Sequence, residues 1–433
     1  MIRARGNSRG SALHGAPSRH SGKARRRARV AFYSHDSFGL GHFRRNLKLA
    51  WAIRALAPDT EILMVTGSPR ATSFTLPPGV VVAKLPAVTK DAAGSYVTRG
   101  LDSPIGDTIR VRKALIRSAV LGFDPDVLIV DHTPIGLRGE LLPLLGDLRH
   151  RTHTQLVLGL RDIIDEPARV RDDWRRNGVP RILEEIYHHI WVYGSPLTFP
   201  VETCYGLSAE VVRKLEYRGY VTQTYRDATG DPSASLGFSD RARPHVLCLV
   251  GGGEDGMPVA RAFLQMIAFA APAWNGTLVT GPFLDRAERH SLAEVASHLP
   301  HVQILRFTSD VERLVSGSDV VITMGGYNSV TEAVGRGRRT LVIPRVFPRR
   351  EQLLRARAFE SLGMVRCLHP DTLDANRLAA AATELLHGPA PVSPTAAGLN
   401  WNGATDFAKR VAEVLNEQTS KESLSHARTQ ARA

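Results

Sequence analysis

The sequence predicts an α/β fold of two similar, doubly wound halves, each a mostly parallel sheet covered by helices on both faces. Short runs rich in β-branched residues alternate with stretches of helical spacing, the pattern of βαβ units. These runs are apolar at nearly every position, as in strands buried on both faces. The pattern stops in a Gly-, Ser-, Asp- and Pro-rich segment over residues 219–244 and then starts again. A chain of 433 residues with such an interruption is expected to form two domains joined by a linker.

The first domain is expected over residues 29–218. It opens with the apolar run Arg-Val-Ala-Phe-Tyr-Ser, which is followed by a stretch with apolar residues three and four apart. Predicted strands cover residues 29–34, 61–67, 80–86, 127–132, 155–162 and 189–195. Predicted helices cover residues 42–57, 103–123 and 172–187.

The second domain is expected over residues 245–418, with a frayed tail over 419–433. It repeats the order of strand, turn and helix. Predicted strands, some with the turn that follows, cover residues 245–253, 276–282, 302–307, 319–326 and 339–344. Predicted helices cover residues 257–270, 328–337, 351–363 and 403–418.

Composition excludes several classes of protein. No apolar run approaches the roughly 18 residues of a membrane-spanning helix, and no apolar segment follows the basic N-terminus as in a secretory signal. Cys204, Cys248 and Cys367 are far apart and lack the spacing of metal ligands. We therefore expect a cytoplasmic protein that at most touches the inner face of the membrane.

Residues 1–28 are expected to be a disordered basic tail. The first 29 residues hold nine arginines and lysines and no acid, within a net charge of +14. This composition buries too little apolar surface to order the segment. The tail is either a solvated extension or a segment that contacts nucleic acid or an anionic membrane. The rest of the chain lacks the aromatic and basic stripe of nucleic-acid-binding sheets, so no nucleic-acid partner is predicted.

The richest motif is Ile-Thr-Met-Gly-Gly-Tyr-Asn-Ser-Val-Thr-Glu, in which a strand turns into a helix. Gly325 and Gly326 allow a tight turn and close approach of a ligand to the backbone. Asn328 and Ser329 stand at the helix start, where unpaired N–H groups can bind a diphosphate. Glu332, one turn on, could accept hydrogen bonds from a ribose or could only favour the helix dipole, and the spacing fits both equally.

Two other turns supply weaker candidates. Glu351 and Gln352 open a predicted helix, where they could bind sugar hydroxyls or be ordinary residues of a first turn. Gly252 stands in the run Gly-Gly-Gly-Glu-Asp-Gly, which permits close backbone approach. That run lacks the Gly-Lys-Ser/Thr ending of a nucleotide-triphosphatase loop, and its acids would repel a diphosphate.

In the first half, Gly-Leu-Gly-His follows the first predicted strand and opens a helix. Gly39 and Gly41 do not fit the dinucleotide fingerprint, because no third glycine is in place. His42 could only cap or pack against its helix, or it could face the cleft between domains and act as a general base near neutral pH. Asp131 ends a strand on the same predicted rim, where it could contact an acceptor or make a structural hydrogen bond.

With both halves considered, the chain resembles the GT-B glycosyltransferases, and most closely the MurG family, whose C-terminal domain is of the glycosyltransferase family 28 type. The similarity extends over roughly residues 29–418. It is most specific in residues 301–352, from His-Val-Gln-Ile-Leu-Arg-Phe to Phe-Pro-Arg-Arg-Glu-Gln. Phe-Gly-Leu-Gly-His is similar to the family's glycine-rich loop. Followed by Arg44, it is also similar to the loop of nucleotide-sugar hydrolases with this fold.

The resemblance implies two Rossmann-like domains that face each other across a cleft, with the nucleotide-sugar donor in the C-terminal one. It places Phe307 near the nucleotide base. It also implies contacts to the diphosphate from Gly326, Asn328 and Ser329, to the ribose from Glu332, and to the sugar from Glu351 and Gln352.

The predicted activity is that of a hexosyltransferase, which moves a sugar from a nucleotide-diphosphate sugar, expected to be UDP-linked, to an acceptor hydroxyl. The acceptor is a carbohydrate, a lipid-linked molecule or another small molecule, and His42 is the candidate base. Candidates for an acceptor or phosphate loop are Gly39, Gly41, Arg44, Asp131 and Gly252. No cofactor or metal is predicted, because no Asp-x-Asp motif stands at the donor site. A nucleotide-sugar hydrolase or epimerase and a non-catalytic nucleotide-sugar binding protein are the alternatives.

Overall fold

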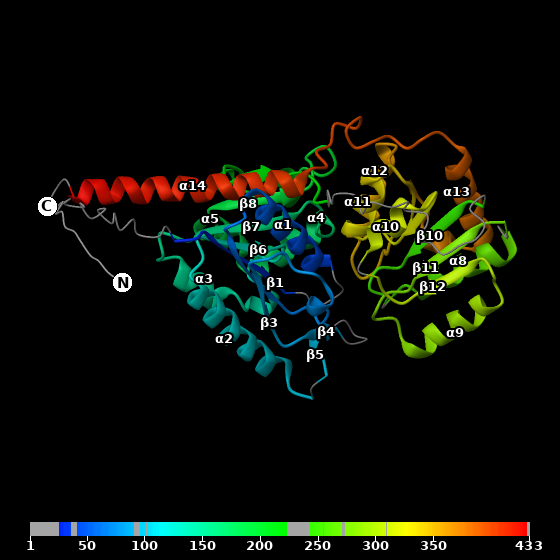
Figure 1. Cartoon of the computed structure of the whole chain (residues 1–433), viewed down its shortest axis with the longest axis horizontal. Helices are drawn as coiled ribbons and strands as arrows, with labels where there is room; N and C mark the ends of the chain where they lie inside the picture. The colour runs from blue at the N-terminus through cyan, green and yellow to red at the C-terminus, as the bar shows by residue number, and fades with distance from the viewer. Residues whose placement is uncertain are drawn as a thin grey trace, which may run out of the picture.

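A computed structural model describes residues 26–35, 41–90, 96–100, 102–222, 243–253, 255–270, 273–308 and 310–430. Two α/β domains lie next to each other, the N-terminal one on the left of Figure 1 and the C-terminal one on the right. The predicted pair of Rossmann-like domains is confirmed. Most of the predicted tail and linker lies outside the described residues.

The N-terminal domain is built on a seven-stranded parallel sheet of order β3-β2-β1-β6-β7-β8-β9. Its strands are β1 (Arg29–Ser34), β2 (Glu61–Thr66), β3 (Val80–Lys84), β6 (Val127–Asp131), β7 (Gln155–Arg161), β8 (His189–Tyr193) and β9 (Leu215–Tyr217). A separate antiparallel pair is formed by β4 (Val88–Lys90) and β5 (Tyr96–Thr98).

Helices cover both faces of this sheet, because successive residues of its buried strands point to opposite sides. Val30 and Phe32 of β1 face a core that includes the first and last helices, whereas Ala31 and Tyr33 face the other core. The helices of this half are α1 (Gly41–Leu56), α2 (Ile105–Phe123), α3 (Leu142–Leu148), α4 (Pro167–Arg176), α5 (Val179–Glu185), α6 (Val201–Tyr205) and α7 (Ala209–Val212).

The C-terminal domain has a six-stranded parallel sheet of order β12-β11-β10-β13-β14-β15. Its strands are β10 (His245–Leu249), β11 (Asn275–Val279), β12 (Val302–Leu305), β13 (Val320–Thr323), β14 (Arg339–Val342) and β15 (Arg366–Cys367). Its helices are α8 (Met257–Gln265), α9 (Arg286–Ser297), α10 (Val311–Ser316), α11 (Tyr327–Gly335), α12 (Glu351–Ser361) and α13 (Ala375–His387).

The last helix, α14 (Gly403–Gln430), returns to the N-terminal domain and packs beside α1 (Figure 1, red). Phe407 meets the ring of Trp191 edge-on, with centroids 4.8 Å apart. The predicted frayed tail over 419–433 is wrong as far as Gln430, since no glycine or proline interrupts residues 404–430 and the helix continues.

Two other boundaries differ from the prediction. The single helix expected over 172–187 is two helices, α4 and α5, separated by Gly178, whose φ of +66° breaks the helical path. At the start of the predicted linker, Tyr220 and Val221 are fully buried, because their apolar side chains join the core beneath α14. Within the described ranges, no helix is long and apolar enough to cross a membrane.

Candidate active site

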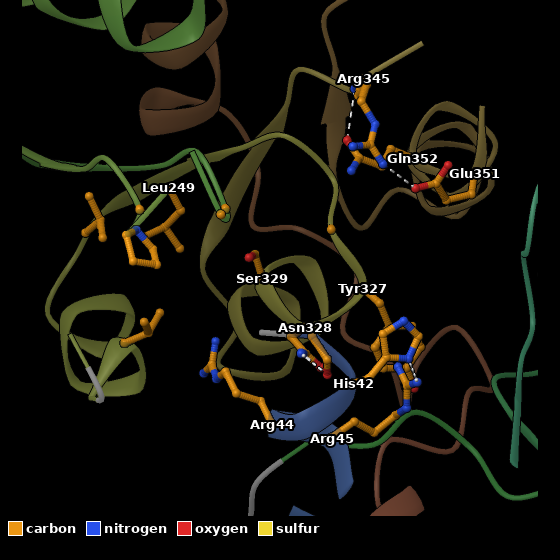
Figure 2. Close-up of a pocket in the computed structure, with 18 of the residues that line it drawn as sticks. His42, Arg44, Arg45, Leu249, Tyr327, Asn328, Ser329, Arg345, Glu351 and Gln352 are labelled. Carbon is orange, nitrogen blue, oxygen red and sulfur yellow. Dashed lines mark hydrogen bonds and ion pairs between the residues drawn. The ribbon is translucent and has the colours of Figure 1, made fainter. Parts of the chain in front are cut away.

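A cavity of about 250 Å³ lies where the two domains meet (Figure 2). In each sheet the strand order reverses, between β1 and β6 and between β10 and β13, and ligands of open α/β sheets bind beyond the strand ends at such points. The wall of the cavity that the N-terminal domain supplies consists of Gly41, His42, Arg44, Arg45 and Arg161. Its C-terminal wall includes Leu249, Gly252, Phe307, Gly326, Tyr327, Asn328, Ser329, Arg345, Glu351, Gln352 and Arg355.

His42 is the second residue of α1, and its ring contacts Asp131, the last residue of β6. The two side chains meet at 2.5 Å between His42 Nδ1 and Asp131 Oδ2. Arg45, one turn along α1, donates to Asp131 Oδ1 at 2.6 Å. Asp131 is fully buried, so it positions His42 from beneath and does not face the cavity. Burial raises the pKa of Asp131, but Arg45 and His42 outweigh that effect and hold the pKa at about 2.

The contact with an ionised Asp131 determines which nitrogen of His42 is available for chemistry. When the imidazole is neutral, Nδ1–H donates to the carboxylate and Nε2 is the basic nitrogen. Nε2 has no partner among the described residues. His35 and His132 flank the ring at centroid distances of 4.8 and 5.3 Å. Burial lowers the pKa of both these neighbours well below the usual histidine value, so they are neutral near pH 7.

Across the cavity, the turn after β13 leads into α11 as the sequence predicts. Gly325 has a φ of +82°, and a Cβ there would lie 3.0 Å from Val342 Cγ1 and 3.3 Å from Gln352 Cβ. Asn328, in the first turn of α11, donates from Nδ2 to the carbonyl oxygen of Gly41 at 3.0 Å. The two predicted turns therefore touch each other across the domain boundary, as the dashed line in Figure 2 shows.

Glu332 lies deeper than the sequence suggests. Its side chain is fully buried, and Oε1 accepts hydrogen bonds from Arg44 Nη2 at 2.8 Å and from Lys48 Nζ at 2.6 Å. Burial raises the pKa of Glu332, but the two cations of α1 overcome this and hold the pKa at about 2. Arg44 thus reaches from the N-terminal wall to the residue expected to bind ribose.

The predicted sugar contacts lie at the start of α12. Glu351 Oε1 accepts from Arg345 Nη2 at 2.8 Å, and Gln352 Oε1 accepts from the Arg345 backbone N–H at 3.0 Å. Burial raises the pKa of Glu351, but Arg345 and other arginines outweigh it and the net pKa is lowered. Phe307 lies in the same cavity wall, its ring edge-on to Phe74 of the N-terminal domain at 6.0 Å.

Several residues predicted to bind the nucleotide-sugar donor have buried polar atoms that make no hydrogen bond within the described part of the chain. Buried polar atoms in proteins nearly always have a hydrogen-bond partner, so each exception needs an explanation. Within the described part of the chain, the buried atoms without a partner include Asn328 Oδ1, Glu332 Oε2 and Glu351 Oε2. Asn328 and Glu351 line the cavity, where these oxygens could accept hydrogen bonds from hydroxyl groups of a bound nucleotide sugar. Glu332 is fully buried and is not among the residues that line the cavity.

Sequence reasoning missed part of the site. No role was predicted for Arg45, Tyr327 and Arg355, which line the cavity, and the role of Asp131 behind His42 depends on the pairing of β1 with β6. The remaining predicted loop residues Gly41 and Gly252 do line the cavity. Gly39 lies outside the described residues. Of the residues that the structure describes, no cluster of three or more His, Cys, Asp or Glu could hold a metal.

Comparisons with known proteins agree with this arrangement. Residues 247–411 match the glycosyltransferase family 28 C-terminal domain. An uncharacterized glycosyltransferase of Methanosarcina mazei is 24% identical over 71% of this chain and 77% of its own length. The UDP-N-acetylglucosamine–N-acetylmuramyl-(pentapeptide) pyrophosphoryl-undecaprenol N-acetylglucosamine transferase of Rubrobacter xylanophilus is 32% identical over 32% of this chain and 39% of its own. The crystal structure of Acinetobacter baumannii MurG shares the fold, with a TM-score of 0.51 and 12% identity over 90% of this chain and 99% of that one.

Two facing Rossmann-like domains with a family 28 domain on the donor side define a GT-B glycosyltransferase. The chain is an enzyme of this class, and its C-terminal half is similar to the MurG-type transferases. At the level of the family, it uses a nucleotide-sugar donor.

Proposed function

We propose that this enzyme moves a hexose-type sugar from a UDP-linked donor to an acceptor hydroxyl, with His42 as the general base. The observation that carries the proposal is that His42 lines the cavity, opposite the turn that opens α11, and contacts the buried Asp131 at 2.5 Å. The acceptor side is assigned to residues 29–218 and the donor side to residues 245–418.

In the proposed reaction, Asp131 holds the ring of His42 with Nδ1 protonated. Nε2 accepts the proton of the acceptor hydroxyl as its oxygen attacks the anomeric carbon of the donor. The bond from that carbon to the diphosphate breaks, and the nucleoside diphosphate leaves with the electron pair. The products are the glycosylated acceptor, the free nucleotide and the proton on His42.

The C-terminal wall supplies the proposed donor contacts. Unpaired N–H groups at the start of α11 suit the diphosphate, with Gly326, Asn328 and Ser329 beside it. The unsatisfied oxygens of Asn328 and Glu351, which line the cavity, support hydrogen bonds to sugar hydroxyls, and the unsatisfied Oε2 of Glu332 is the proposed ribose contact. Phe307 would lie near the base. The muramyl-pentapeptide relative, which by its name takes UDP-N-acetylglucosamine, is the reason for choosing UDP.

The proposal includes no cofactor and no metal. Neutralisation of the leaving diphosphate is assigned to the N-terminus of α11 and to Arg44 and Arg345, which ion pairs fix in place before the reaction begins. A cytoplasmic location and a peripheral contact of the basic N-terminal segment with anionic membrane remain predictions from composition.

Calorimetric titration with UDP, dTDP and GDP tests the donor assignment, and UDP is expected to bind most tightly. Mass spectrometry of a reaction with UDP-sugars and a mixture of carbohydrate and lipid-linked acceptors then identifies the product. Rapid release of UDP and free sugar without any acceptor would instead identify a nucleotide-sugar hydrolase. Binding of a UDP-sugar with no turnover under any condition would indicate a binding protein.

A further inference from the structure

The cavity is lined by several arginines, and one of them differs from the rest in its surroundings. Four have a carboxylate within ion-pair distance: Arg44 with Glu332, Arg45 with Asp131, Arg345 with Glu351 and Arg355 with Asp162. Arg161, the last residue of β7, has none among the described residues. Arg161 lines the cavity, and the residue is only partly buried.

A neutral histidine holds Arg161 in place. Nη2 of Arg161 lies 2.9 Å from Nε2 of His132, which acts as the acceptor because its lowered pKa keeps the ring neutral. His132 has a φ of +69°, an uncommon conformation for a residue with a side chain, so the backbone after β6 is bent to present this ring. The neutral ring fixes the guanidinium without cancelling its charge.

Within the described residues, no carboxylate lies close enough to Arg161 to neutralise its charge. Burial lowers the pKa of Arg161, and Arg45 and Arg355 lower it further, to about 9. The group is still a cation near pH 7. Glu351 and Asp131 attract it only from beyond ion-pair distance, since each is held by another arginine. A fixed guanidinium without an anionic partner is suited to a bidentate carboxylate or phosphate.

We propose that Arg161 binds an oxyanion carried by the acceptor, so that the acceptor is an acidic molecule with a carboxylate or a phosphate near the hydroxyl that is glycosylated. This inference rests on the proposed function, because it takes His42 as the group that meets the acceptor. His132 contacts both residues: its ring lies 5.3 Å from that of His42, and it holds Arg161. All three residues stand at the same edge of the N-terminal sheet. The donor diphosphate is assigned to α11 in the opposite wall.

The inference is tested on the full-length protein saturated with UDP, which fills the donor phosphate site. Glucuronate and glucose 6-phosphate are titrated as acidic probes, with glucose as the neutral match. In the wild type, one or both acids should bind about tenfold or more tightly than glucose. The two acids separate a carboxylate from a phosphate as the recognised group.

Three variants complete the test. Arg161→Gln should abolish the preference for the acid and leave UDP affinity unchanged, and Arg161→Lys, which keeps the charge, should retain part of the preference. Arg175→Gln removes an exposed arginine paired with Asp172 outside the cavity and should behave as the wild type. Should Arg161→Gln fail to fold, the acid preference of Arg161→Lys and the comparison of acids with glucose in the wild type still test the inference.

Several results would overturn the inference. One is that the wild type binds the acids no more tightly than glucose. Another is that Arg161→Gln keeps the preference for the acids. A third is that Arg161→Gln loses as much affinity for UDP as for the acids, which would assign Arg161 to the donor. Failure of the wild type to bind UDP at all would overturn the proposed function as well, so the two failures are distinguishable.

Discussion

At the scale of single residues, ion pairs between the domains dominate the site. Glu332 belongs to α11, whereas its two cationic partners, Arg44 and Lys48, belong to α1. The same carboxylate is the proposed ribose contact through Oε2, which has no partner within the described residues. Under the proposed function, this one buried side chain has two roles, in domain contact and in nucleotide binding, and a substitution should affect both.

Glu332→Gln should lower nucleotide affinity by ~1–3 kcal/mol, the usual cost of a lost charge-assisted hydrogen bond. It should also destabilise the protein by about 3–5 kcal/mol, because two largely buried cations lose their carboxylate. Calorimetry with UDP and urea unfolding measure the two effects separately. A folded variant with wild-type affinity for UDP would refute the ribose contact, whatever its stability.

The lowered pKa values of Glu332 and Asp131 predict a pH dependence. Each carboxyl has a folded-state pKa of about 2, below its ordinary value of about 4 in an unfolded chain. The stability that each contributes is therefore fully present above about pH 4.5 and is lost as the pH falls toward 2. The difference in unfolding free energy between wild type and Glu332→Gln should shrink between pH 5 and pH 3. A constant difference over that range would mean that the Glu332 pKa is not depressed.

At the scale of elements, both walls of the cavity are turns that leave a parallel strand and enter a helix. Such turns are readable from sequence, because a buried strand, glycines and a helix cap follow each other within a few residues. The start of α11 and most of the strands are for this reason close to their predicted positions. The pairing of His42 with Asp131 was not predictable in this way, since 89 residues separate them and only the adjacency of β1 and β6 brings them together.

Gly325→Ala tests the turn before α11. The substitution places a side chain at a φ of +82° and 3.0 Å from Val342 Cγ1, so it should cost at least ~1 kcal/mol of stability and displace the start of α11. UDP affinity should fall at least tenfold as the N–H groups move away from the diphosphate.

Gly337→Ala is the matched control for this substitution. Gly337 also has a positive φ, +65°, but no atom lies within 4 Å of its added Cβ and it does not line the cavity. The Gly337→Ala protein should lose a similar amount of stability in urea unfolding and keep its affinity for UDP. Equal affinity losses in the two variants would show that the effect comes from general destabilisation.

At the scale of the whole molecule, the chain crosses between its domains twice. After the C-terminal sheet is complete, α14 returns to pack on α1, so the last helix is part of the N-terminal core. The alternation of strand and helix predicted two domains but not this return, because the apolar stripe of α14 fits either domain equally well. The prediction of an acceptor-side domain over 29–218 thus omits a helix that this domain needs.

Phe407→Ala should show this dependence. The side chain is fully buried and contacts Trp191 and Tyr193 of β8, so its removal should lower the unfolding free energy by ~3–5 kcal/mol. Because the lost contacts belong to the N-terminal sheet, tryptophan fluorescence of Trp191 should report the transition. The exposed Lys409 on the same helix supplies the control, and Lys409→Ala should unfold as the wild type does. An unchanged midpoint for Phe407→Ala would contradict the packing of α14.

The central claim is that His42 takes a proton in the reaction, and the most direct test measures kcat and UDP affinity for His42→Ala and His42→Asn with the acceptor identified by mass spectrometry. Loss of the base should reduce kcat by ~10²–10⁴-fold in both variants, because an amide hydrogen-bonds but does not accept the proton near pH 7. UDP affinity should change little, since the proposed donor contacts lie in the opposite wall. An Asn variant with near wild-type kcat would contradict the account and leave His42 as a helix cap.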